Sequence, residues 1–372
     1  MEKQLFTSES VSPGHPDKVC DYISDLILDA HLRLDPKSRV AVETLVKDDN
    51  IVLGGEITST ADVDIEALVA GVYADIGYDI KPRITNLLNS QSADIALGTN
   101  DDVGGAGDQG MMFGYACDET ANFMPLAISI AHDLIKKADT LRKNGDFKWA
   151  KPDMKSQVTI DYSGSTAKVH TVLMSIQHDA DYDETAFKEY IKGFIAEVVK
   201  SYNLNTDYKV LLNPTGRFVI GGPIGDAGVT GRKIIVDTYG GYSPHGGGAF
   251  SGKDPTKVDR SAAYMARYLA KNIVAAGLAK KCTIQLSYAI GIKEPISVNI
   301  NLHDTGIDEN KVTEKIMELV DLTPKGIIDR FDLKRPIYAS CSRYGHFGAE
   351  VKDGITVPWE QLDLVAELKK IL

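Results

Sequence analysis

Apolar residues recur at helical spacing along much of the chain. After the turn-rich stretch SVSPGHP at 10–16, apolar side chains follow every three or four residues up to Leu34, which predicts a first helix. The same spacing predicts further helices over 62–76, about 120–140, 184–202 and 254–277. Pro125 fits its helix only near the start, and Asp254–Pro255 is typical of a cap followed by a first-turn proline.

Shorter alternating segments predict strands, most of them in pairs. The expected hairpins join 39–46 to 51–58, 157–162 to 168–177, and 283–290 to 296–302. A single strand is expected over 233–238. Because hairpins alternate with helices, the chain is expected to be an α+β protein with mixed or antiparallel sheets, whereas a parallel βαβ series would show single strands between helices.

The length of the chain and one short repeat bear on its domain organisation. At 372 residues the chain exceeds one ordinary hydrophobic core, which predicts two or three domains. The tetrapeptides GDQG at 107–110 and GDAG at 225–228 begin roughly one third of the chain apart, and each precedes an apolar run. Three similar units would explain this spacing, and so would a coincidence.

Composition and charge exclude several classes of function. The net charge of -11 argues against an electrostatic nucleic-acid binder. No window of about 18 residues is both apolar and uncharged, so neither a transmembrane helix nor a membrane partner is expected. The N-terminus lacks a signal-peptide pattern, and the four cysteines lack metal-binding or redox spacing, so a cytoplasmic protein with reduced, buried thiols is expected.

The stretch from Asn213 to Arg260 concentrates glycines and cations. It holds six lysines and arginines against four aspartates, a local excess of positive charge in an acidic chain. Glycine lets backbone N–H groups approach an anion, and lysine and arginine add full charges. We therefore expect an enzyme site that grips the polyphosphate of a nucleotide, anchored on GGGAFSGKD at 246–254; the alternative is a solvated loop.

The anchor segment partly matches a P-loop. Residues 247–253 fit G-x-x-x-x-G-K, but the next residue is Asp254, where a P-loop has the Ser or Thr that ligates magnesium. The segment also does not follow the expected strand at 233–238 directly. A Walker-type fold is therefore rejected as the main interpretation, and a P-loop phosphotransferase remains an alternative.

Two acids near these motifs are candidate metal ligands. Asp17 follows His15 in GHPDK, and Asp259 follows the glycine loop. Mg²⁺ prefers one or two carboxylates together with phosphate oxygens and waters. On local grounds Asp17 alone would be a helix cap and His15 a surface histidine. A further glycine cluster, GGAGDQG at 104–110, follows an acidic stretch at 91–103 that is expected to be a lid.

Six motifs along the chain resemble those of the S-adenosylmethionine synthetases (methionine adenosyltransferases). They are FTSESVSPGHPDK near the N-terminus, GAGDQG at 105–110, NPTGRFVIGGP at 213–223, GRKIIVDTYGG at 231–241, HGGGAFSGKD at 245–254 and YGHFG at 344–348. The resemblance implies that the sulfur of L-methionine attacks C5′ of ATP and expels tripolyphosphate, which the same site hydrolyses to pyrophosphate and phosphate. Because a thioether carries no proton, the attack needs no general base, and fixed positive charge lowers the barrier.

The resemblance also implies roles for the residues that match the family's motifs. The implied catalytic residues are His15, Lys155, Arg232, Lys233 and Lys253. The implied ATP contacts are His15, Asp153, Lys155, Arg217, Phe218, Asp226, Arg232, Lys233, Ala249, Lys253 and Ile290. The implied methionine contacts are Glu56, Gln91, Asp108, Asp226 and Lys257, the last of which also holds the polyphosphate. The implied cofactors are two Mg²⁺ per site, on Asp17 and Asp259, and one K⁺ per site, on Glu43.

The implied fold is three similar two-layer α/β sandwiches around a pseudo-threefold axis, with mixed sheets. Domains are expected at 1–100, 104–220 and 221–372, interleaved in space. Family members are homodimers or dimers of dimers (homotetramers), with each site built across a subunit interface. The chain is shorter than many relatives between Gly77 and Gln91 and in the lid. A silent regulatory copy is the competing hypothesis, but it would be expected to have lost His15, a metal acid or a loop lysine.

Overall fold

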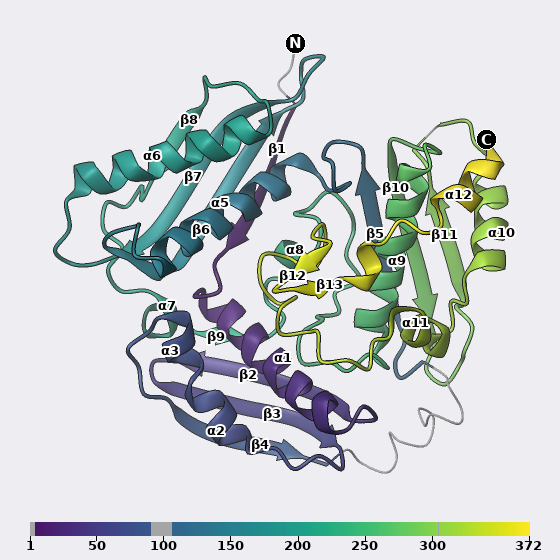
Figure 1. Cartoon of the computed structure of the whole chain (residues 1–372), viewed down its shortest axis with the longest axis horizontal. Coiled ribbons are helices and arrows are strands. Elements are labelled where there is room, and N and C mark those ends of the chain that lie inside the picture. The colour runs from purple at the N-terminus through teal and green to yellow at the C-terminus, as the bar shows by residue number, and fades with distance from the viewer. Residues whose placement is uncertain (1–3, 91–105, 304) are drawn as a thin grey trace.

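Three larger β-sheets, each packed against one long helix, form the described part of the chain (Figure 1). The structure is a computed structural model that describes residues 4–90, 106–303 and 305–372. Two of these sheets combine antiparallel with parallel pairing, and the third is antiparallel. The α+β class with mixed sheets is therefore confirmed.

The three sheets are built on one chain order: a long helix, a hairpin and then a further helix. The first unit contains α1 (Pro16–Leu34), β2 (Arg39–Lys47), β3 (Asn50–Thr58), α2 (Ile65–Ala70), α3 (Val72–Ile76) and β4 (Arg83–Asn89). The second contains α5 (Leu126–Lys143), β6 (Ala150–Asp161), β7 (Lys168–His178), α6 (Glu184–Ser201) and β8 (Lys209–Leu212). The third contains α9 (Val258–Ala275), β10 (Lys281–Tyr288), β11 (Ser297–Asn301) and α10 (Glu309–Leu319). In the first two units the last strand pairs in parallel with the second strand of the hairpin, β4 with β3 and β8 with β7.

Each unit completes its sheet with a strand that lies elsewhere in the sequence. The strand β1 (Leu5–Val11) precedes α1 but pairs with β6 of the second unit. In the same way β5 (Gly110–Cys117) precedes α5 but pairs with β10, and β9 (Gly228–Val229) precedes α9 but pairs with β2. The three units thus exchange edge strands in a cycle, which is the relation expected of three similar, interleaved units. The residue numbers at which they divide stay a prediction.

The remaining elements are short and connect or cover these units. They are α7 (Gly222–Gly225), α8 (Ile234–Asp237), α11 (Pro324–Phe331), β12 (Val351–Lys352), β13 (Ile355–Thr356), α12 (Val365–Leu368) and the 3₁₀ turns Pro358–Glu360 and Lys369–Ile371. Among the described helices, none combines the length and the apolar character that crossing a bilayer would require.

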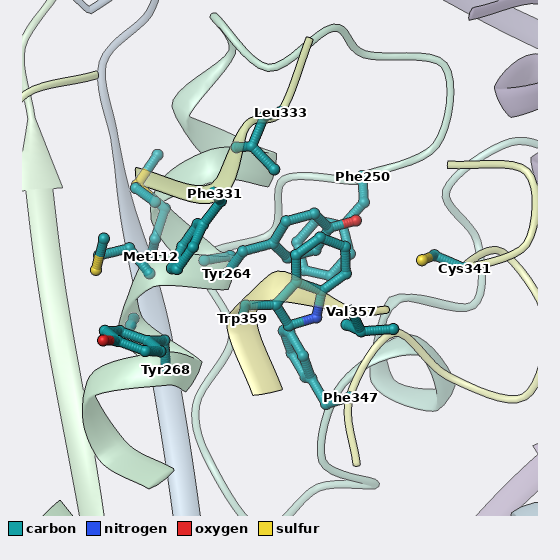
Figure 2. Close-up of a cluster of buried hydrophobic side chains, with 14 of the residues drawn as sticks. Met112, Phe250, Tyr264, Tyr268, Phe331, Leu333, Cys341, Phe347, Val357 and Trp359 are labelled. Carbon is teal, nitrogen blue, oxygen red and sulfur yellow. The ribbon is translucent and has the colours of Figure 1, made fainter. Parts of the chain in front are cut away.

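An aromatic cluster anchors the glycine loop to the core of the third unit (Figure 2). The ring of Tyr264 on α9 stacks on that of Trp359, with centroids 3.7 Å apart. Phe250, which belongs to GGGAFSGKD, is 2% exposed and packs edge-on against Tyr264. A loop rich in glycine would otherwise be costly to order, so this buried ring is what ties the predicted phosphate-binding segment to the core.

The predicted strand at 233–238 is wrong, because the structure has the short helix α8 there. Its flanking residue Lys233 contacts Asp17, and its last residue Asp237 contacts Lys18. Asp17 and Lys18 are neighbours on α1, so their partners must also lie close together. A helical turn separates residues four apart by about 6 Å, whereas a strand would separate them by about 13 Å.

Three predicted helices have different limits in the structure. The helix expected over 62–76 is divided into α2 and α3 at Gly71. The helix expected from about 120 begins only after Pro125, which is its N-cap residue. The helix expected from 254–255 begins at Val258, and Gly277 follows its end with a left-handed φ of 81°, as a C-terminal stop requires. The predicted hairpins 39–58, 157–177 and 283–302 are confirmed, with shifts at their ends.

Candidate active site

His15 and Asp17 begin helix α1, and both are buried. His15 is the N-cap residue, and its Nδ1 accepts the backbone N–H of Asp17 at 3.2 Å. Burial, followed by the charges on Lys233 and Lys155, lowers the pKa of His15 to about 3. The imidazole is therefore neutral near pH 7, and because Nδ1 is an acceptor its proton is on Nε2. The alternatives of a capping Asp17 and a surface His15 are both wrong.

The carboxylate of Asp17 joins helix α1 to β9 and to the segment that follows it. Its Oδ2 lies 2.5 Å from Nζ of Lys233, and its Oδ1 accepts the N–H of Val229 at 3.0 Å. Nη1 of Arg232 is 3.9 Å from the same Oδ1, and the Arg232 side chain is exposed. Burial acts to raise the pKa of Asp17, but the Lys233 ammonium and the Val229 N–H outweigh it and hold this pKa below its usual value.

Asp153 on β6 presents a carboxylate oxygen that the described protein leaves unsatisfied. Its Oδ2 accepts the N–H of Gly222 at 2.8 Å, while Oδ1 is buried and has no hydrogen-bond partner among the described residues. Burial raises the pKa of Asp153 to about 6. A buried acceptor without a partner is costly, so a donor on a ligand is its expected partner. Lys155, two residues further along β6, and Asp226, after α7, are both exposed.

A second group of predicted residues gathers between the glycine loop, α9 and β2. Nζ of Lys253 lies 2.7 Å from Oδ2 of Asp259, and an isolated β-bridge joins Lys253 to Ala41 of β2. Glu43, also on β2, is exposed, but partial burial still raises the pKa of its carboxyl against the opposing charge of Lys253. This group adjoins the group around His15 and Asp17, because the backbones of the two meet: a Cβ built on Gly231 would approach the Cβ of Ala249 to 2.5 Å.

Asp254 explains why the anchor segment is not a P-loop. Its side chain is fully buried and accepts the N–H of Val40 at 2.8 Å, the hydroxyl of Thr256 at 2.6 Å and the ammonium of Lys257 at 2.6 Å. The carboxylate therefore fastens the loop to β2 and has no free face for a metal. A hydroxyl residue, as in a P-loop, would leave several of these donors without an acceptor.

The other predicted site residues lie on exposed segments around these two groups. Arg217 is exposed and Phe218 is half-buried after β8, where the N–H of Phe218 donates to His178 at 3.0 Å. Glu56 on β3 and Asp108 before β5 are exposed, and Ile290 after β10 is 56% exposed. Gln91 and the lid expected at 91–103 lie outside the described residues.

Comparisons with known sequences show the family of the chain. Three family models match the chain: the N-terminal domain of S-adenosylmethionine synthetase over 3–99, the central domain over 103–218 and the C-terminal domain over 220–361. The chain belongs to the S-adenosylmethionine synthetase family. It is 56% identical over 384 residues to the S-adenosylmethionine synthase of Mycoplasma mycoides subsp. mycoides SC, covering 100% of this chain and 98% of that protein.

Two further relatives also match over nearly the full length of both chains. The S-adenosylmethionine synthase of Mesoplasma florum is 56% identical over 381 residues, which are 99% of this chain and 100% of that protein. That of Mycoplasmopsis pulmonis is 54% identical over 376 residues, or 100% and 99% of the two chains. The family resemblance seen in the motifs is therefore confirmed over the whole chain.

Asp17 and Asp259, the candidate Mg²⁺ ligands of this synthetase-family chain, do not form a complete metal site by themselves. Among the described residues, no three His, Cys, Asp or Glu side chains gather closely enough to hold a metal. Asp17 and Asp259 each pair with a lysine instead. One carboxylate with phosphate oxygens and waters nevertheless suits Mg²⁺, so both fit a metal that arrives with a nucleotide. Glu43 likewise supplies one oxygen donor for a monovalent cation.

The structure also brings functional residues to the site that the motifs did not single out. Helix α1 carries buried aspartates once per turn, at positions 17, 21, 25 and 29, and each accepts a backbone N–H from a segment distant in sequence: Asp17 and Asp21 from 229–231, Asp25 from Gly252 and Asp29 from Ala339. His245 lies beside Asp259, and its Nδ1 accepts the N–H of Gly247 at 2.8 Å. These acids lie on the face of the predicted helix opposite its apolar stripe, where a polar pattern is ordinarily solvated, so the sequence carried no signal of their burial.

Proposed function

We propose that this chain synthesises S-adenosylmethionine from ATP and L-methionine and then hydrolyses the released tripolyphosphate to pyrophosphate and phosphate. The observation that carries the proposal is the buried, neutral His15 beside the Asp17–Lys233 pair. Membership of the synthetase family supports the overall reaction. The finer steps below rest on the geometry of the residues.

His15 acts on the departing tripolyphosphate as a hydrogen-bond donor. Its Nδ1 is occupied by the N–H of Asp17, so Nε2–H is the group left to meet an oxygen of the ligand. Because burial keeps the pKa of His15 at about 3, the ring donates a hydrogen bond without first gaining a proton. This suits the oxygen that bridges C5′ and the α-phosphorus, on which charge develops as the C5′–O bond breaks.

Cations from two segments stabilise the same leaving group. Arg232 and Lys233 follow β9, and Lys253 ends the glycine loop. The sulfur of methionine supplies the electron pair for the new S–C5′ bond, and the C5′–O pair leaves on the tripolyphosphate, so the protein has no proton to remove from the nucleophile. Fixed positive charge near the phosphates is therefore the main contribution of the side chains. Mg²⁺, when bound at Asp17 and Asp259, adds further positive charge to the phosphate oxygens.

Substrate binding surrounds these cations. Oδ1 of Asp153, which is buried and has no partner among the described residues, accepts a hydrogen bond from ATP in this proposal. In this proposal Phe218 and Arg217 supply an aromatic face and a cation for adenine, and Ala249 and Ile290 line the same ATP site. Methionine is held by Glu56, Gln91, Asp108, Asp226 and Lys257. K⁺ is held by Glu43.

We further propose that the chain works as a dimer or a dimer of dimers with shared sites. The face of the β2–β3–β4 sheet that carries Glu43 and Glu56 is exposed and also presents Leu45 and Leu87, which are 41% and 58% exposed. In the sheet register Glu43 and Leu87 flank Gly54. Exposed apolar side chains next to site carboxylates are typical of a surface that a partner covers.

The product assay tests the reaction directly. Purified protein is incubated with ATP, L-methionine and Mg²⁺, with and without K⁺, and products are separated by ion-exchange chromatography. We expect S-adenosylmethionine, pyrophosphate and phosphate in equal amounts, with faster formation when K⁺ is present. Added tripolyphosphate should also be hydrolysed to pyrophosphate and phosphate. Transfer of the γ-phosphate to an acceptor, or no S-adenosylmethionine under these conditions, would contradict the proposal.

A further inference from the structure

A fully buried ion pair lies beneath the GGGAFSGKD loop. Nη2 of Arg260, in the first turn of α9, donates to Oδ1 of Asp25 at 2.7 Å and to Oδ2 at 2.8 Å. Both side chains are inaccessible to solvent. Asp25 lies in the middle of α1, so the pair fixes the start of α9 against the helix that carries His15 at its N-terminus. One guanidinium nitrogen donates to both carboxylate oxygens, and the absence of solvent strengthens this charge-assisted contact.

The same two residues bracket the backbone at Lys253. Oδ1 of Asp25 accepts the N–H of Gly252 at 2.9 Å, and Nη1 of Arg260 donates to the carbonyl oxygen of Lys253 at 3.1 Å. Gly252 has a φ of +80°, and a Cβ there would meet the carbonyl oxygen of Val42 at 2.0 Å. The peptide from which the Lys253 side chain projects is thus held on both sides by one ion pair.

The ion pair also fixes the position of Asp259, the partner of Lys253. Asp259 immediately precedes Arg260 in α9, so fixing Arg260 fixes the backbone from which the Asp259 carboxylate projects. The ammonium and the carboxylate meet at 2.7 Å. A shift of Arg260 would therefore move both side chains.

The arrangement is repeated one turn earlier in α1. Oδ1 of Asp21 accepts the N–H of Gly231 at 2.9 Å, directly before Arg232. Its other oxygen lies 3.0 Å from Nζ of Lys18, which donates its hydrogen bond to Asp237, so the repeat extends to the acid and the glycine and not to the cation beside them. Two neighbouring acids of one helix thus hold two glycines, and each glycine precedes a cation of the proposed site. This recurrence indicates a purpose beyond filling the core.

We propose that Asp25 and Arg260 are positioning residues that set the place of the Lys253 ammonium and the Asp259 carboxylate. The proposal rests on the proposed function, in which Lys253 stabilises the departing tripolyphosphate. Both positioning residues are buried and act only through the backbone of the loop and the start of α9. A misplacement of about 1 Å in such a site can lower the rate by about 100-fold, so the effect is expected in kcat.

A second buried pair on the same helix provides a matched control. Nε and Nη2 of Arg267 donate to the two carboxylate oxygens of Glu360, each at 3.0 Å, and both side chains are fully buried. Arg267 also donates to three backbone carbonyl oxygens, those of Tyr115, Asn122 and Phe123. Arg267→Lys should therefore reduce stability at least as much as Arg260→Lys, although none of the described partners of Arg267 belongs to the proposed site.

The experiment compares Arg260→Lys with Arg267→Lys in the full-length protein. Thermal melts establish the folded fraction, and S-adenosylmethionine formation gives kcat and the KM for methionine per folded enzyme. We expect Arg260→Lys to lower kcat by about 10-fold or more with KM changed by less than about twofold, and Arg267→Lys to leave kcat within about twofold. Equal losses of kcat in the two variants, or an unchanged kcat in Arg260→Lys, would overturn the proposal.

A second pair of variants keeps the test decisive if Arg260→Lys does not fold. Asp25→Asn is then compared with Glu360→Gln in the same assay. We again expect kcat to fall by about 10-fold or more in the first variant and to stay within about twofold in the second. If neither Arg260→Lys nor Asp25→Asn folds while both controls do, the pair is a folding element and the proposal is overturned. Wild-type protein is assayed alongside: no product from it would contradict the proposed function itself, whereas equal losses in the variants would contradict only the positioning role.

Discussion

Nζ of Lys233 lies 2.5 Å from Oδ2 of Asp17, at the buried start of helix α1. Lys253 and Asp259 form the corresponding contact at the start of α9, at 2.7 Å. Each of the two carboxylates proposed to bind Mg²⁺ thus has a lysine as its partner. If Mg²⁺ took the carboxylate of such a pair, the lysine would be free to contact a phosphate oxygen. The proposed metal ligands are therefore direct neighbours of the proposed phosphate-binding lysines.

Removal of a phosphate-directed cation should reduce turnover more than methionine binding. Because the charges act on the leaving group, Arg232→Ala and Lys253→Ala should each lower kcat by about 100-fold and change the KM for methionine far less. Steady-state kinetics of S-adenosylmethionine formation measures both constants. Lys188→Ala, on the exposed face of α6, removes a lysine that pairs with Glu184 of the same helix and should leave both constants unchanged. An unchanged kcat in both site variants would refute their assignment.

His15→Ala should separate the two reactions of the proposed cycle. The Nε2–H donor is assigned to the oxygen next to C5′, which is involved only in adenosyl transfer. The variant should therefore lose about 10²-fold or more in S-adenosylmethionine formation and much less in the hydrolysis of added tripolyphosphate. Phosphate release from tripolyphosphate and product formation from ATP are measured on one preparation. Equal losses in both assays would count against this role.

The buried state of His15 should also appear in the pH dependence of stability. Burial lowers the pKa of His15 from 6.5 to about 3, so between these values the unfolded chain binds more protons than the folded one. Stability is therefore lost as the pH falls through this window, by about 1.4 kcal/mol per pH unit for this one group. His15→Asn removes the group, so the free energy of unfolding of the variant relative to wild type should rise by about 2 kcal/mol between pH 6.5 and 5.

Urea unfolding of both proteins across this pH range measures the difference. Between pH 7.5 and 8.5 the two curves should run parallel, because His15 is neutral in both states there. A constant difference down to pH 5 would mean that the imidazole is not held neutral by the fold.

Leu87→Asp should disrupt the proposed self-association. Leu87 is 58% exposed on the sheet face that carries Glu43, and a charge buried there against a second chain would be unpaired. We expect association to weaken by about 10-fold or more, with activity falling as the enzyme is diluted. Sedimentation velocity measures association. Met317→Asp, which changes a 51% exposed residue on α10, is the control. Unaltered sedimentation of the Leu87 variant would move the interface elsewhere.

Glu43→Gln should abolish the response to K⁺ while the enzyme keeps its requirement for Mg²⁺. The amide lacks the charge of the carboxylate, and a monovalent cation is held weakly without it. Rates are measured over a range of K⁺ concentrations at constant ionic strength, with Na⁺ as the compensating ion. A K⁺ stimulation equal to that of wild type would remove Glu43 from the cation site.

Local patterns predicted those parts of the fold whose cause is local. The hairpin of β2 and β3 and the helices α1 and α6 follow from periodicity and short turns, because each sits on one face of its own unit. The segment 234–237 was predicted wrongly because its helical form is imposed by Asp17 and Lys18 on another element. The start of α9 was missed for a similar reason: Asp254 bonds to Val40 of β2 instead of capping the helix.

For the site, motifs named the residues but not their partners. His15, Asp17, Lys233, Lys253 and Asp259 all came from sequence, and the structure gathers them into two adjoining groups. The neutral state of His15 depends on burial and on two lysines distant in sequence, which no local pattern contains. The ion pair of Asp25 with Arg260 joins residues of two different units for the same reason.

The sequence by itself determined the family, the α+β class and the chemical character of the site, because these depend on residue types at short spacing along the chain. The tertiary structure alone decided which strand completes which sheet and which acid holds which loop. Those relations join segments far apart in the chain, and their free energy comes from burial and paired charge that exist only after the three units have closed on one another. That closure also converts three of the four regularly spaced aspartates of α1 from an ordinary polar pattern into buried supports for the cations of the proposed site.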